Sequence, residues 1–66
     1  MSEAAQAIDA AQGELARHGW SAGDMALTTA AGLIWMVYAH RGEHRIVAKA
    51  ASQATAWSEA ARLSRD

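Results

Sequence analysis

Two histidines and a glutamate lie within five residues of one another, and these side chains bind metals or transfer protons. His40 and His44 flank the segment Arg41-Gly42-Glu43. A metal site needs three or four converging ligands, whereas a tight turn at Arg41-Gly42 would direct the two imidazoles to opposite faces of a hairpin. We therefore predict no metal site, and we interpret both histidines as solvated residues beside a turn.

The sequence does not predict a catalytic site either. General acid–base catalysis needs paired groups in a cleft, and nothing groups His18 or Asp24 with a nucleophile. The glycines are scattered, so no phosphate-binding loop is formed. A chain of 66 residues also has little room for a ligand pocket of several hundred Å³. We expect a protein that is not an enzyme and that holds no cofactor.

Composition narrows the class of protein further. The chain has no cysteine, which excludes a disulfide framework and thiolate metal ligands. Its net charge of −1 argues against broad electrostatic binding to nucleic acid or acidic membranes. No apolar run approaches the roughly 18–20 residues that span a bilayer, and no signal-peptide pattern opens the chain. We expect a cytoplasmic protein that makes no membrane contact.

Basic residues gather in the middle of the chain, where residues 25–50 carry three of them against Glu43 alone. Basic side chains beside an aromatic ring on an open sheet are typical of platforms for single-stranded nucleic acid. So few cations give little affinity at physiological salt, and a small nucleic-acid-binding protein is therefore the alternative function. The residues that such a protein would use are Tyr38, Arg41, Arg45 and Lys49.

Apolar residues that recur every three or four positions predict a helix near each end of the chain. The first helix is predicted over residues 3–18, with Ser2 as its N-cap and Gly19 just after its end. The second is predicted over residues 52–64, with Ser52 as its N-cap.

Between the helices, β-branched and aromatic residues predict three strands, at residues 25–30, 33–40 and 43–50. Residues 20–24 are rich in turn formers and predict a connector. The whole chain is then a single small α+β domain with an antiparallel three-stranded sheet, in the order αβββα. A two-residue turn at Arg41-Gly42 would place Tyr38 opposite Arg45 on the sheet.

The predicted hairpin has two apolar faces. Trp35, Val37 and Ile46 lie on one face, which should meet Trp57 of the second helix. The other face carries Ile34, Met36, Tyr38 and Val47 with Arg45 and Lys49, and Met25 and Leu27 extend it. Both helices on the first face would leave the second exposed. One helix on each face, or Met25 and Trp20 folded over the second face, would cover it instead.

The order of elements and the last helix resemble those of double-stranded RNA-binding domains. That family opens its final helix with Ser-Lys-Lys-x-Ala-Lys and follows with paired alanines. Ser52, Ala56, Ala60 and Ala61 match this pattern here, while Gln53, Ala54 and Trp57 stand where the family has lysines. Because those lysines grip phosphates, the resemblance implies the same fold used for protein contact or self-association. Small antitoxin-like and inhibitor-like proteins are similar in the same general way.

The small supply of core residues also favours a partner. Of the hydrophobic residues, 18 are alanine, and only about fifteen larger apolar side chains remain, each worth roughly 1.5–3 kcal/mol when buried. The preferred function is thus a protein-interaction module, a small regulator or inhibitor, which docks on a protein or forms a homodimer. The partner-binding residues that we predict are Ile34, Met36, Tyr38, Val47, Arg45 and Lys49.

Overall fold

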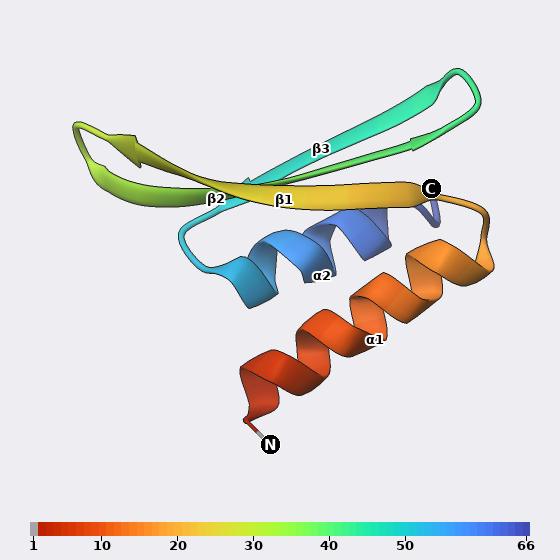
Figure 1. Ribbon diagram of the computed structural model, residues 1–66, viewed down its shortest axis with the longest axis horizontal. Coiled ribbons are helices and arrows are strands. Elements are labelled where there is room, and N and C mark those ends of the chain that lie inside the picture. The colour runs from red at the N-terminus through yellow and green to blue at the C-terminus, as the bar shows by residue number, and fades with distance from the viewer. Residues whose placement is uncertain (1) are drawn as a thin grey trace.

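The computed structural model describes residues 2–66, which form two helices and one antiparallel sheet of three strands (Figure 1). In chain order the elements are α1 (Glu3–Arg17), β1 (Ser21–Thr29), β2 (Gly32–Arg41), β3 (His44–Ala50) and α2 (Gln53–Leu63). The strands lie in the sheet in the order β1-β2-β3. The predicted α+β class and the order αβββα are therefore confirmed.

Both helices begin at the predicted serine caps. The Ser2 hydroxyl accepts a hydrogen bond from the Ala5 amide at 3.1 Å, and Ser52 accepts one from the Thr55 amide at 3.2 Å. Each bond satisfies a backbone donor that has no partner within the first turn of its helix.

The end of α1 forms a Schellman motif around Gly19. Gly19 has a φ of 83° and donates its amide to the Ala16 carbonyl, while the Trp20 amide reaches back to the Leu15 carbonyl at 3.0 Å. This pattern favours glycine, because an L side chain is strained at positive φ. The motif turns the chain sharply and brings the Trp20 side chain into the core beside Leu15.

Both helices lie on the same side of the sheet (Figure 1). Helix α2 packs directly against β2 and β3, whereas α1 packs mainly on α2 and reaches the sheet at β1. Of the arrangements left open by the sequence, the one observed has both helices on the first face.

The core lies between the sheet and the helices. Leu15 and Val37 are its most completely buried large side chains, and Trp20 and Trp57 are buried beside them. Trp35 is half-buried and packs against this cluster. Alanines on the inner side of α2 let the helices and the sheet approach closely; they are Ala56, Ala60 and Ala61.

The predicted register of the second hairpin was wrong by two residues. Arg41 pairs with His44, so that the loop is Gly42-Glu43 rather than Arg41-Gly42. Gly42 has a φ of 59°, and no non-glycine residue among 2–66 has a positive φ. A type II′ turn needs glycine at its first central position, which Gly42 supplies here and Arg41 could not. Because side chains alternate with a period of two, the shift leaves every residue on its predicted face.

The first strand was also predicted wrongly. It begins at Ser21, four residues before the predicted start, and the expected connector is part of the sheet. Its turn to β2 is Ala30-Ala31, where the Thr29 hydroxyl accepts a hydrogen bond from the Ala31 amide and donates one to the Gly32 carbonyl. Pairing with the end of β2 overrides the low strand preference of glycine and aspartate in this segment.

Candidate interaction site

The sheet face opposite the helices is a candidate interaction surface, which we call the open face. Strand register places the side chains of alternate residues on it, because directly opposed residues in antiparallel strands share a face. Its apolar members are Met25 and Leu27 of β1, Ile34, Met36 and Tyr38 of β2, and Val47 of β3. The structure therefore brings together all six residues predicted to bind a partner, including Arg45 and Lys49.

The apolar side chains of the open face are strongly exposed. The exposed fraction is 45% for Met25, 38% for Leu27, 46% for Tyr38 and 56% for Val47. Their neighbours Ile34 and Met36 are half-buried between them. Of the large hydrophobic residues exposed within residues 2–66, Leu33 alone lies on the helix side, at the end of the β1–β2 hairpin.

The hydroxyl end of the Tyr38 ring lies over Gly23 of β1. A Cβ atom at position 23 would be 2.7 Å from the Tyr38 hydroxyl oxygen and 2.9 Å from the adjoining ring carbon. The two residues are directly opposed in the β1–β2 ladder. Gly23 thus provides a flat seat for the ring, in the manner in which aromatic residues cover glycines on sheets. Tyr38 nevertheless remains exposed to solvent.

The charges of the open face are all basic. Arg45 and Lys49 both belong to β3, where Arg45 is opposite His40 and Lys49 is opposite Met36. They therefore line one edge of the apolar area. No carboxylate within residues 2–66 forms an ion pair with either of them.

Arg41, the fourth residue predicted for nucleic-acid binding, lies on the helix side of the sheet. Its guanidinium stands 4.7 Å from the centre of the Trp20 ring and donates a hydrogen bond to the His18 carbonyl at 3.0 Å. It covers the end of α1 instead of joining Tyr38. Arg41 is thus separated from the other three residues of the alternative site.

Asp24 is a polar link between the sheet and α2. Its Oδ2 atom accepts hydrogen bonds from Gln53 Nε2 at 2.8 Å and from Trp57 Nε1 at 2.9 Å. These two bonds hold the pKa of the Asp24 carboxyl below its ordinary range, because they stabilise the charged form. The residue is used for structure and it fixes β1 to the start of α2.

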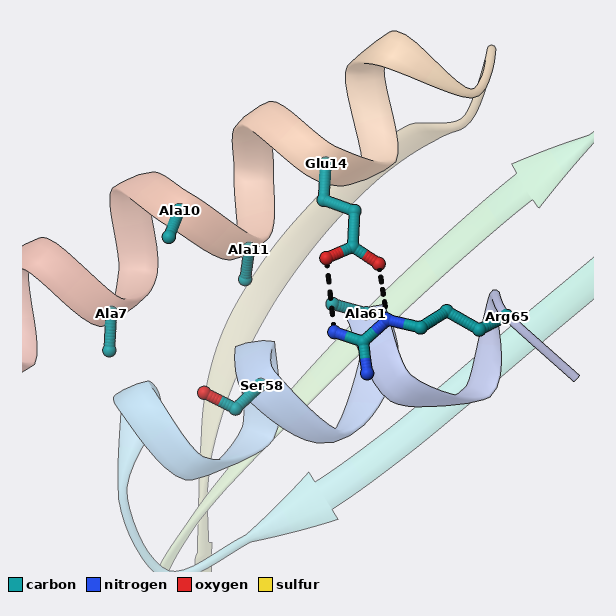
Figure 2. A pocket seen from close by; sticks show the side chains of 7 residues that line it. All are labelled: Ala7, Ala10, Ala11, Glu14, Ser58, Ala61 and Arg65. Atoms are coloured by element: carbon teal, nitrogen blue, oxygen red, sulfur yellow. Dashed lines mark hydrogen bonds and ion pairs between the residues drawn. The ribbon is translucent and has the colours of Figure 1, made fainter.

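A shallow groove lies between the two helices. It measures about 180 Å³, and alanines of α1 and α2 form its walls (Figure 2). Arg65 closes one end by donating from Nε and Nη2 to the Glu14 carboxylate at 2.7 and 3.0 Å. This pairing lowers the pKa of Glu14. Because Glu14 and Arg65 are paired with each other, Ser58 is the one other polar side chain that lines the groove.

The histidines do not converge. The β2–β3 register places His40 on the open face and His44 on the helix side. In the part of the chain that the structure describes, no three His, Asp or Glu side chains gather as metal ligands would. Neither of the helices described there has the length and apolar character needed to cross a membrane.

Comparison with known proteins adds no relative. The chain matches no family model, no curated protein and no solved structure. The resemblance to double-stranded RNA-binding domains stays a prediction.

Sequence reasoning missed two structural residues of β1, Gly23 beneath Tyr38 on the open face and Asp24 at the contact with α2. Gly23 and Asp24 were assigned to a connector because their residue types favour turns. Met25-Ala26-Leu27 alternates large and small residues, but Ser21–Asp24 does not, so no local pattern marked the start of the strand.

Proposed function

We propose that this protein is a non-enzymatic protein-interaction module that docks, through the open face, on a partner protein or on a second copy of itself. One observation carries the proposal: both helices cover the same side of the sheet and leave six apolar side chains together on the other side. Monomeric proteins seldom expose contiguous apolar patches, and those that do usually bind another molecule there.

The types of residue on the open face support a protein partner. Tyrosine, methionine and arginine are enriched in protein interfaces, and central aromatic residues often carry most of the binding energy. Tyr38 lies opposite Val47 on this face, and its hydroxyl end packs over Gly23. A ring with few alternative positions loses little entropy when a partner covers it.

The proposal places the protein in the cytoplasm and assigns it no catalysis. A secreted chain of this size ordinarily carries disulfides, and this one has no cysteine. Two hollows among residues 2–66 measure about 180 and 190 Å³. Both are smaller than the roughly 300–1,000 Å³ of ordinary small-molecule sites.

Binding of single-stranded nucleic acid is the second candidate function. The exposed ring of Tyr38 with Arg45 and Lys49 favours it, since bases stack on such rings. The engagement of Arg41 with Trp20 leaves this site with two cations. A site that neutralises fewer phosphates binds nucleic acid more weakly, and its affinity depends less steeply on salt.

Selection from a random peptide library displayed on phage tests the proposed function. We expect selected peptides to bind the protein and to lose roughly tenfold or more in affinity for Met36→Asp and Tyr38→Ala. Leu33→Asp is the matched control, because Leu33 is 52% exposed on the opposite side of the sheet. Circular dichroism verifies that each variant is folded.

Light scattering coupled to gel filtration, over a series of concentrations, tests whether the chain forms a homodimer. A mass of twice 7.0 kDa that Met36→Asp halves would identify a homodimer through the open face. A single-chain mass at every concentration, together with no selectable peptide, would overturn the proposed function. Peptides that bind Met36→Asp as well as the native chain would overturn it too.

A further inference from the structure

The two cations of the open face have no ion-pair partner among the described residues, unlike Arg62 and Arg65. Arg62 pairs with Glu59 and Asp66, and Arg65 pairs with Glu14. Arg41 stacks on Trp20. Arg45 and Lys49, in contrast, point from β3 to the same side as the apolar patch and have no ion pair within residues 2–66.

The strand residues of the open face therefore carry a formal charge of +2 from Arg45 and Lys49 and no acid. Glu43, in the turn before β3, forms no ion pair with either cation. Asp24, the one carboxylate of β1, is directed to the helices and bonded to Gln53 and Trp57. A partner that covers the apolar patch and brings its own carboxylates would meet both cations.

We propose that the occupant of the open face is an acidic amphipathic protein segment, with apolar side chains on Met36 and Tyr38 and carboxylates on Arg45 and Lys49. This inference rests on the proposed function and names its partner. The apolar contact supplies the affinity, and the two cations fix the orientation of the segment, because rim charges give specificity more than affinity.

The dimensions of the open face suit a helical segment. The strands are about 4.8 Å apart, so β1 and β3 are separated by roughly 10 Å, close to the 10–12 Å diameter of a helix. On the other side, the same sheet already accommodates α2. Arg45 and Lys49 are four residues apart in one strand, or about 13 Å. Carboxylates seven or eight residues apart on a helix, a rise of roughly 10–12 Å, would reach both.

A second copy of the chain complements this face less well. Its own open face would bring two further cations and no carboxylate to the contact. Nucleic acid would meet the two cations but would place phosphates and sugars over six apolar side chains, where an apolar partner surface gains more. Both occupants remain outcomes of the test.

Three synthetic peptides of about 18 residues, which span roughly 27 Å as helices, serve as probes. All have the same leucine stripe. They differ at two positions on one flank, seven residues apart, which are Glu in the first peptide, Gln in the second and Lys in the third. Fluorescence anisotropy of end-labelled peptides gives each affinity at low and at high salt. We expect the Glu peptide to bind roughly tenfold tighter than the Lys peptide at low salt, and this preference to shrink at high salt.

Charge reversal on the protein supplies the decisive comparison. The double variant R45E/K49E should prefer the Lys peptide, because the sign of the rim is inverted. Arg17→Glu is the matched control, since it changes a cation at the end of α1, away from the open face, and should leave the preference as it is. Retention of the Glu preference by R45E/K49E would overturn the inference.

The remaining outcomes separate this inference from the proposed function. Equal affinity for all three peptides, abolished in Met36→Asp, would overturn the acidic partner and support the open face as a docking surface. A homodimer that no peptide dissociates would identify the second copy as occupant and overturn the inference. Binding of a single-stranded oligonucleotide at Tyr38, with no peptide bound, would overturn both.

Discussion

Gly23 and Asp24 are neighbours in β1, yet they act on opposite sides of the sheet. The missing side chain of Gly23 leaves room for the Tyr38 ring on the open face. Asp24 points the other way and binds Gln53 and Trp57 of α2. Because side chains alternate along a strand, adjacent residues of β1 position Tyr38 on one side of the sheet and anchor α2 on the other.

Gly23→Ala should move Tyr38 without unfolding the protein. The added Cβ would approach the ring to 2.7–2.9 Å, and the ring belongs to a side chain that can rotate away. Because the backbone keeps its strand conformation, we expect a change of within about 1 kcal/mol in the free energy of unfolding. Ring resonances of Tyr38 should shift in NMR spectra, and the affinity of selected peptides should fall.

A double-mutant cycle checks that this effect acts through the ring. In the Tyr38→Ala background, Gly23→Ala should cause no further loss of affinity, since no ring is left to displace. Additive losses in the double variant would show that Gly23 does not work by positioning Tyr38.

We expect the free energy of unfolding to fall in acid because of Asp24. The folded state holds its pKa below the ordinary value, so the unfolded state binds more protons as the pH falls. Its contribution is complete above about pH 4, the ordinary value for aspartate, and is lost as the pH drops through the lower folded value. Asp24→Asn should cost about 1–2 kcal/mol at pH 6, where charged hydrogen bonds are removed, and less at pH 3. Urea denaturation at both pH values measures this, and an equal cost at the two would contradict it.

At the scale of elements, alanine substitutions of Gly13 and Gly42 should change stability in opposite directions. Gly42 begins the β2–β3 turn with a φ of 59°, and Gly42→Ala should lower the free energy of unfolding by about 1 kcal/mol. Gly13 lies within α1, where an added Cβ would meet only Arg17 Nη1, at 3.8 Å. Gly13→Ala should therefore stabilise the protein by about 0.5–1 kcal/mol. Denaturation curves of the two variants should shift in opposite directions.

The β2–β3 hairpin shows which structural features the sequence predicts and which it does not. Periodicity and serine caps were sufficient to predict both helices, and alternation was sufficient to assign the faces of β2 and β3. The register required knowledge of which residue takes positive φ, and this depends on the geometry of the turn rather than on composition. The start of β1 depended on contacts with Tyr38 and Trp57, which are distant in sequence.

The position of the helices was the part of the candidate site that no local pattern could decide. Both faces of the hairpin carry apolar residues, so either could have received a helix. The partners that position α2 are Asp24, bonded to Trp57 and Gln53, and the alanines that allow close packing. These are tertiary contacts, and local sequence patterns do not contain them.

For the whole molecule, the small accessible surface limits the area that the open face can contribute to an interface. The accessible surface is 4316 Å², and a standard interface buries about 800 Å² from each partner. Such an interface would occupy nearly a fifth of the protein. A partner of the proposed kind that buries this much would therefore extend across most of the sheet, as a segment that runs along the strands would.

The layered arrangement of the helices also determines how the molecule comes apart. Helix α1 buries only Ala11 and Leu15 and is attached mainly to α2, which is itself seated on the sheet. Regions with few buried contacts open locally before the rest unfolds. In native-state hydrogen exchange, we expect the amides of α1 to exchange faster than those of Val37 and Ala48. The sheet with its open face would then outlast the helix that precedes it, so brief openings of the N-terminal end would leave the open face intact.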